Sequence, residues 1–137
     1  MSTLDSVIIE RPLRPFVVFT GVLFLDQLLK HVFLIQDDFQ KNFGALFGWK
    51  LDYFWAFLAL TILCGLIHLN RCPRKGVARS GLSFALIFSG VVSNLLDRIR
   101  FGFIIDYIHF FAPFVFNLAD LALLLGAGLL IWNIIEE

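Results

Sequence analysis

The stretch FNLADLALLLG, residues 116–126, opens the last long apolar run of the chain and carries two polar side chains, Asn117 and Asp120. A charged side chain at membrane depth costs about 3 kcal/mol unless another group compensates for it. The stretch SNLLDR, residues 93–98, repeats the Asn-Leu-x-Asp spacing at the end of another apolar run. The repetition predicts that these polar groups satisfy one another in a common cluster.

The composition favours lipid as the solvent of this chain. Of its 137 residues, 59% are hydrophobic and 17 are Phe, and the mean hydropathy is +0.85. A soluble domain has roughly 45–50% apolar residues, and a soluble protein of this size cannot bury a larger excess. The formal net charge of zero gives no indication of nucleic-acid binding.

Four segments approach the roughly 20 apolar residues that a helix needs to cross the hydrocarbon core. They cover about residues 15–35, 53–70, 77–96 and 114–135. We therefore expect an all-α membrane protein with four transmembrane helices in a single domain, residues 1–137. No signal-peptide cleavage site follows the first segment, so we expect it to be a retained helix. Small residues such as Gly126 and Gly128 favour close helix packing.

The basic residues near the apolar segments predict the orientation. Lys and Arg concentrate in cytoplasmic loops, and here they precede the first segment and crowd the connection between the second and third, at Arg11, Arg14, Arg71, Arg74, Lys75 and Arg79. Both chain ends should then be cytoplasmic, and residues 36–52 and 97–113 should form outer loops. Residues 36–52 alternate polar and apolar side chains and contain two glycines, which predicts a small β-like cradle outside the membrane.

The polar residues of the apolar segments converge on one depth. With a rise of about 1.5 Å per residue, Asp26, Gln27 and Lys30 lie in the outer half of the first helix. The third helix ends on the outer side, and the fourth begins there. The remaining members of this level are Asn94, Asp97, Asn117 and Asp120, with Asp106 in the outer loop between the two helices.

Several of these residues have a purely structural interpretation. Asp26 and Lys30 are four residues apart and are expected to form an ion pair on one helix face. Asp97 is expected to pair with the adjacent Arg98, and Asn94 and Asn117 are suited to interhelical hydrogen bonds. The histidines and the cysteines show no metal-ligand or redox spacing, so we expect neither a metal site nor a cofactor.

Asp106 and Asp120 have no adjacent Lys or Arg, and Asp106 lies within the apolar stretch FIIDYIHFF. Two carboxylates in a shared, partly dry pocket cannot both ionise cheaply, so one keeps a proton. An aspartic protease uses this arrangement, because the ionised acid takes a proton from water and the protonated acid polarises the scissile carbonyl. The spacing alone does not fix the distance between the two acids.

The ordered motifs resemble those of the lipoprotein signal peptidase family, also called signal peptidase II. The matching stretches are DQLLK at 26–30, NFGALFG at 42–48, SNLLDRIRFGFIIDYIHF at 93–110 and FNLADLALLLG at 116–126. They follow the order of the family, with one motif at each helix end or outer loop. Four motifs in register with four expected spans make the resemblance specific.

The resemblance implies a multi-pass aspartic endopeptidase of the bacterial inner membrane, with its active site near the outer face. Its substrates would be prolipoproteins, cleaved before a diacylglyceryl-modified cysteine among membrane lipids, and globomycin would inhibit it. Asp106 and Asp120 would be the catalytic pair. Asn42, Gly44, Asn94, Arg98 and Asn117 would bind substrate or support the pair, and Asp26, Lys30 and Asp97 would be structural.

The chain departs from the usual family pattern at Ser93, Leu46 and Tyr107, which bears on substrate preference more than on chemistry. A small four-helix proton-coupled transporter is the main alternative function, and a structural membrane scaffold is a third. A transporter acid is expected near the bilayer midplane, whereas the acids here gather at one interface.

Overall fold

The computed structural model describes residues 3–44 and 74–136. Three long helices account for most of these residues, and four short strands connect them. In chain order the elements are α1 (Thr3–Gln36), β1 (Gln40–Asn42), α3 (Arg74–Phe101), β2 (Ile104–Asp106), β3 (Ile108–Phe111), β4 (Phe114–Phe116) and α4 (Leu118–Ile135).

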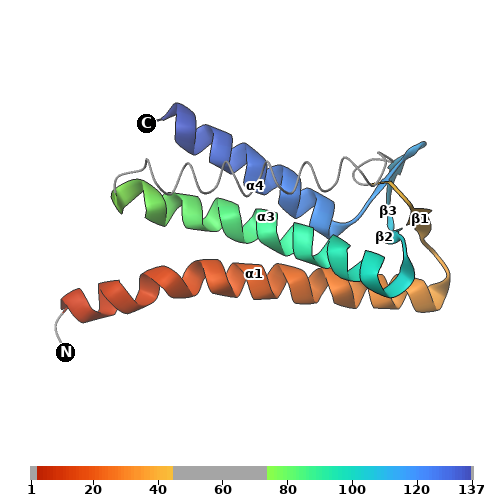
Figure 1. Cartoon of the computed structure of the whole chain (residues 1–137), viewed down its shortest axis with the longest axis horizontal. Helices are drawn as coiled ribbons and strands as arrows, with labels where there is room; N and C mark the ends of the chain where they lie inside the picture. Colours follow the sequence, from red (N-terminus) through yellow and green to blue (C-terminus); the bar gives the residue numbers. More distant parts are fainter. Residues whose placement is uncertain (1–2, 45–73, 137) are drawn as a thin grey trace.

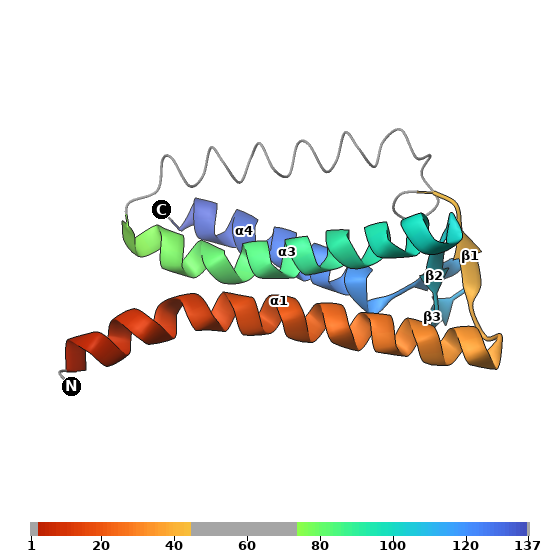
Figure 2. The ribbon, with the colours of Figure 1, turned by 60° about the horizontal axis from the view of Figure 1, so that its bottom comes forward.

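The helices lie side by side, and the strands gather at one end of the molecule, here called the strand end (Figure 1). Helix α3 packs against both α1 and α4, whereas α1 and α4 make fewer contacts with each other. Helices α1 and α3 run toward the strand end and α4 runs away from it, so both chain termini lie at the opposite end (Figures 1 and 2).

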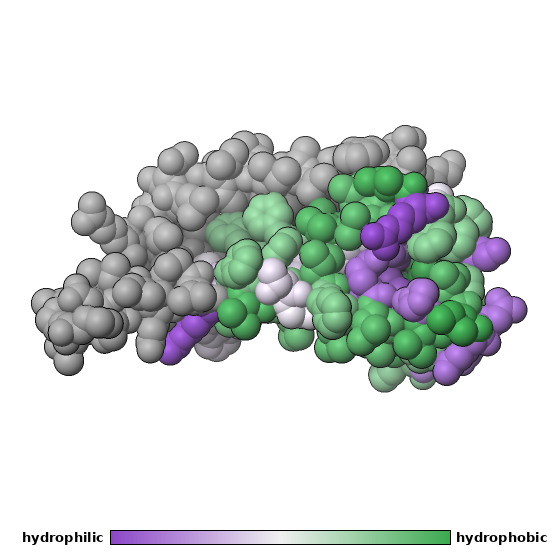
Figure 3. All heavy atoms as spheres, turned by 90° about the horizontal axis from the view of Figure 1, so that it is seen from below, coloured by the Kyte–Doolittle hydropathy of each residue, from purple (hydrophilic) through white to green (hydrophobic). Residues whose placement is uncertain are grey.

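Two of the described helices contain a segment long and apolar enough to cross a membrane, Arg14–Gln36 in α1 and Gly81–Phe101 in α3. A shorter apolar segment, Leu118–Asn133, covers most of α4. Large apolar side chains face outward on these helices, including Phe24, which is 71% exposed. In Figure 3 apolar side chains cover much of one face, and polar ones gather mainly toward the strand end.

The helical prediction is confirmed for three of the four segments, and the predicted segment 53–70 lies outside the described residues. Several predicted boundaries were wrong. Helix α1 begins at Thr3 and α3 at Arg74, before the starts predicted at about residues 15 and 77. Helix α3 continues to Phe101, five residues into the predicted outer loop, since Arg98 and Arg100 in its last turn suit the negative helix C-terminus. Helix α4 begins at Leu118 because Asn117 caps it, and the three residues 114–116 belong to a strand.

The strands belong to both predicted outer loops. Strand β1 pairs in antiparallel register with β2, with Gln40 opposite Asp106 and Asn42 opposite Ile104, and β3 pairs with β4. The predicted cradle at residues 36–52 was therefore incomplete, because its described strand pairs with a strand from the loop 97–113. This pairing brings the first loop against Asp106.

Helices α3 and α4 approach most closely at glycines. A Cβ atom placed on Gly126 would lie 2.7 Å from Ile87 Cγ1 and 2.8 Å from the backbone oxygen of Ser83. A Cβ on Gly90 would clash with the backbone oxygen of Ala119 and with Leu123. A Cβ on Gly128 would meet no atom within 4 Å, so of the two glycines singled out in α4, only Gly126 serves the packing.

We predict that Gly126→Ala lowers the free energy of unfolding by about 1–3 kcal/mol, because the backbone of α3 would have to move away. Gly128→Ala, two residues further along the same helix, is the matched control. It should be neutral or stabilising by up to about 1 kcal/mol, since Ala favours a helix over Gly. Equal effects in a detergent unfolding titration would contradict this packing.

Candidate active site

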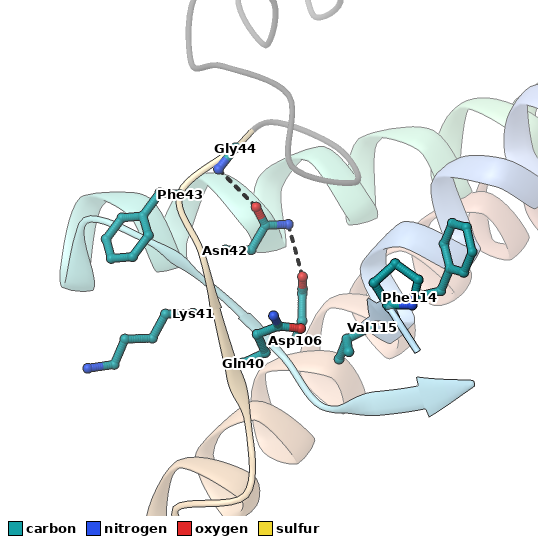
Figure 4. A pocket seen from close by; sticks show the side chains of 9 residues that line it. Gln40, Lys41, Asn42, Phe43, Gly44, Asp106, Phe114 and Val115 are labelled. Carbon is teal, nitrogen blue, oxygen red and sulfur yellow. Dashed lines mark hydrogen bonds between the residues drawn. The ribbon is translucent and has the colours of Figure 1, made fainter. Parts of the chain in front are cut away.

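Asp106 ends strand β2 and is only 2% exposed. Its two carboxylate oxygens each accept a hydrogen bond from an asparagine: Asn42 Nδ2 lies 2.9 Å from Oδ2, and Asn117 Nδ2 lies 2.7 Å from Oδ1. Asn42 comes from β1, so the strand pairing positions its amide beside the acid (Figure 4). Asp106 is thereby held by β1 of the first outer loop and by the residue that caps α4.

Asp120 lies in the first turn of α4 and is 7% exposed. Asn94 of α3 donates to its Oδ1 at 2.8 Å. The backbone N–H of Asp120 donates to Asn117 Oδ1 at 2.9 Å, which makes Asn117 the N-cap of α4. Since the amide nitrogen of Asn117 donates to Asp106, a single asparagine connects the two predicted acids.

The environment of Asp106 favours its protonated form. Burial first, and then the charge of Asp120, raise the pKa of Asp106 from its ordinary value to about 7. The hydrogen bonds from Asn42 and Asn117 and the charge of Lys30 act in the opposite direction. Asp120 is thus close enough to influence the charge of Asp106, and the pair can hold one proton near neutral pH.

A fully buried lysine lies behind the two acids. Lys30 Nζ is 2.8 Å from Asp26 Oδ2 and 2.7 Å from Asp97 Oδ2, and it donates to Asn94 Oδ1 at 2.9 Å. The predicted pair of Asp26 and Lys30 is therefore confirmed. Asp97, expected beside the adjacent Arg98, also supplies the second carboxylate to Lys30, and its charge acts on Arg98 as well. We call Asp26, Lys30, Asn94 and Asp97 the lysine cluster.

The lysine cluster holds the backbone directly before each of the two acids. Asp97 Oδ2 accepts the N–H of Ile105, the residue before Asp106, at 3.2 Å. Asp26 Oδ1 accepts the N–H of Ala119, the residue before Asp120, at 3.1 Å. Buried charges need such partners, and here the partners include the chain segments that carry the two acids.

Sequence reasoning missed the contribution of Tyr107. Its hydroxyl donates to Asp26 Oδ1 at 2.8 Å and accepts the N–H of Leu118 at 3.1 Å. Burial first, and then the charge of Asp26, raise the pKa of Tyr107 above its ordinary value, so the hydroxyl keeps its proton. The available signal was a lone phenol within an apolar stretch next to a candidate acid.

Gln27, which the sequence places at the depth of the polar cluster, joins this network, whereas Ser93 was missed as a member of it. Gln27 Nε2 donates to Ser93 Oγ at 2.8 Å and to Asp97 Oδ1 at 3.0 Å, and Ser93 Oγ donates to Asp26 Oδ2 at 2.6 Å. The departure at Ser93 therefore adds a hydrogen bond between α3 and α1. Leu46, which departs from the family pattern in the first outer loop, lies outside the described residues.

A cavity of about 430 Å³ opens at Asp106 (Figure 4). Its lining comes from β1 and the residues that follow it, from the end of β2, and from β4 with the residue before it. It consists of Gln40, Lys41, Asn42, Phe43, Gly44, Asp106, Pro113, Phe114 and Val115. The N–H of Gly44 donates to Asn42 Oδ1 at 2.9 Å, which fixes the amide that faces Asp106. Asp120 is not among the described lining residues and connects to this site through Asn117.

Arg98 lies near the same acids, and the charges of Asp106 and Asp97 both act on it. All the predicted site residues are thus placed at the strand end of the molecule. Within residues 3–44 and 74–136, no group of three or more His, Cys, Asp or Glu side chains is arranged to hold a metal ion.

The fold is similar to that of proteins with solved structures. Two solved structures of bacterial membrane enzymes match it with TM-scores of 0.68 and 0.69 at 20% and 18% identity. Each match covers 90% of this chain, and 88% and 94% of the respective solved chains. At this level of identity the likeness concerns the fold alone.

The sequence assigns the family. The model of the signal peptidase (SPase) II family matches residues 18–136. The lipoprotein signal peptidase of Halothermothrix orenii is 33% identical over 132 residues, covering 85% of this chain and 91% of that protein. That of Moorella thermoacetica is 33% identical over 135 residues, covering 83% and 87%. The chain belongs to the signal peptidase II family and is a protease, and the transporter alternative has no support.

We predict that Lys30→Met lowers the free energy of unfolding by about 3–5 kcal/mol, because two buried carboxylates lose their counter-ion. Arg100→Met is the matched control, since Arg100 is exposed and makes a 3.3 Å hydrogen bond to Gln27. Its cost should stay below about 1.5 kcal/mol. Unfolding titrations in detergent compare the two, and similar losses would contradict the role given to the lysine cluster.

Proposed function

We propose that the chain is an aspartic endopeptidase that removes the signal peptide from prolipoproteins, cleaving before a diacylglyceryl-modified cysteine. The main support is that one asparagine, Asn117, contacts both Asp106 and the backbone of Asp120. The pKa of about 7 for Asp106 supports a pair that carries one proton. The family supplies the lipoprotein substrate class.

The chemistry follows from a single shared proton. The ionised carboxylate takes a proton from water while the water oxygen attacks the scissile carbonyl carbon, and the protonated acid gives its proton to the carbonyl oxygen. The carbon–nitrogen bond of the tetrahedral intermediate then breaks: the leaving amine takes a proton from the protonated acid, and the ionised acid takes a proton from a hydroxyl of the intermediate as the new carboxyl group forms. Both products leave, and the pair returns to its singly protonated state.

The asparagines orient this chemistry. Asn42 and Asn117 hold the carboxylate of Asp106, and Asn94 holds that of Asp120. Asn42 and Gly44 line the cavity at Asp106, where an extended substrate backbone would lie. Arg98 would contribute its charge beside the pair. Asp26, Lys30 and Asp97 support the site from within the helices.

The substrate would reach the site from the membrane. Both chain termini lie opposite the strand end (Figure 1), so cytoplasmic termini would place the acids near the outer face of the bacterial inner membrane. Exposed aromatic side chains on the β3–β4 hairpin would contact the lipid chains of the substrate and the bilayer. They are Phe110, Phe111 and Phe114. The chain would form a single domain, and globomycin would inhibit it by binding at this site.

We predict that Asp106→Asn and Asp120→Asn each reduce cleavage of a diacylglyceryl-modified precursor by about 10³-fold or more, because neither variant retains both an acid and a base. Both variants should remain folded, since Asn preserves the volume and the hydrogen-bonding shape of the side chain. Asp38→Asn, at an exposed acid following α1, is the control and should cleave normally. Purified protein with a lipidated precursor, with and without globomycin, provides the assay.

Normal processing by either Asn variant would refute the paired-acid assignment. Cleavage insensitive to both substitutions would point to a different class of protease.

We further predict that kcat falls as the pH rises through about 7, because Asp106 then loses the shared proton. The raised pKa makes the protonated form available below that pH, and deprotonation leaves two carboxylates with no acid to polarise the carbonyl. A pH–rate profile between about pH 5 and 9 would measure this fall in kcat. A rate that stays constant up to pH 9 would contradict it.

A further inference from the structure

We propose that Tyr107 is a positioning residue for the reaction: its hydroxyl fixes the strand that carries Asp106 relative to the helix that carries Asp120. This inference rests on the proposed function, because it assumes that the two acids act together. It concerns the geometry between the acids and adds no new group to the chemistry.

The hydroxyl has a defined role in both of its contacts. The carboxylate of Asp26 can only accept, and the backbone N–H of Leu118 can only donate, so the hydroxyl donates to the first at 2.8 Å and accepts from the second at 3.1 Å. Three elements therefore meet at one oxygen atom: α1 through Asp26, the end of β2 through Tyr107, and the start of α4 through Leu118.

The two contacts lie directly beside the acids in the chain. Tyr107 follows Asp106, and Leu118 precedes Asp120 by two residues. The first N–H groups of a helix have no partner within the helix, so the hydroxyl supplies the partner that the start of α4 lacks. Asp26 Oδ1 also accepts the N–H of Ala119 at 3.1 Å. The carboxylate of Asp26 thus binds both the first turn of α4 and the hydroxyl of Tyr107.

The ring of Tyr107 is held independently of its hydroxyl. It is 5% exposed and stacks on Phe33, with ring centroids 4.8 Å apart and an interplanar angle of 11°. The backbone N–H of Tyr107 donates to the carbonyl oxygen of Phe116 at 3.2 Å. Tyr107→Phe therefore removes one oxygen atom and leaves the ring contact and the backbone contact in place.

The test compares Tyr107→Phe with wild type in the precursor-cleavage assay. We expect kcat to fall about 10- to 100-fold, the effect of displacing reacting groups by up to about 1 Å. KM should change less than about twofold, because Tyr107 is not a lining residue of the cavity. A loss of kcat with KM unchanged separates positioning from substrate binding.

Two control variants separate the hydroxyl from other effects. Thr20→Val also removes one hydroxyl, but Thr20 is exposed and bonds only to carbonyl oxygens of its own helix, at 2.9 and 3.2 Å. It should leave kcat unchanged. Phe33→Leu removes the stacking partner and keeps the hydroxyl, so it should lower stability with a smaller loss of kcat than Tyr107→Phe.

A measurement on the wild-type protein guards against a variant that fails to fold. Amide hydrogen exchange at Leu118 should be slow for the first turn of a helix, because its N–H is bonded to the buried hydroxyl. Fast exchange there, or wild-type kcat in a folded Tyr107→Phe variant, would overturn the positioning role. If the Asp106 and Asp120 variants are inactive while Tyr107→Phe is fully active, only this inference fails; activity in those Asn variants would refute the proposed function itself.

Discussion

The burial of the Lys30 ammonium group is the constraint on which the strand end of the molecule depends. A lone charge in a low-dielectric interior is costly, so Lys30 must have carboxylate partners in excellent geometry. Asp26 comes from its own helix and Asp97 from α3. The same two carboxylates accept backbone N–H groups from Ile105 and Ala119. Charge compensation inside the helices therefore also fixes β2 and the start of α4.

The low dielectric that makes this cluster necessary also suits the proposed chemistry. Asp106 is 2% exposed, and burial is the largest cause of its raised pKa. Asparagine side chains connect the acids to each other and to Lys30 without adding charge, since Asn94 accepts from Lys30 and donates to Asp120. The Lys30 ammonium group is therefore connected to Asp120 through Asn94, and the two acids can still share a proton.

The sequence predicted what depends on local spacing and failed where distant segments meet. The four-residue spacing of Asp26 and Lys30 predicted their contact correctly. Local spacing placed Asp97 beside Arg98, whose charge it influences, but did not reveal its ion pair with Lys30, because Lys30 lies on α1. The pairing of β1 with β2 and the two contacts of the Tyr107 hydroxyl join segments more than ten residues apart, which no helical or strand periodicity encodes.

The start of α4 shows how the two kinds of information combine. The sequence predicted that Asn117 and Asp120 belong to one polar cluster, and the structure adds that Asn117 follows β4 and caps the helix that carries Asp120. The hydrogen bond from the Asn117 side chain to Asp106 also requires the segment between α3 and α4 to bring Asp106 next to the start of α4. The hydrogen bond between Gln27 and Ser93 escaped prediction for the same reason, because it joins α1 to α3.

Infrared difference spectroscopy on protein with isotope-labelled aspartate carboxyls tests the central claim most directly, since it observes the shared proton itself. We expect a protonated carboxyl signal that is present at about pH 5 and disappears as the pH rises through about 7, the pKa of Asp106, and that is altered in Asp106→Asn. If every labelled carboxyl is already ionised at about pH 5, the two acids share no proton and the account is wrong.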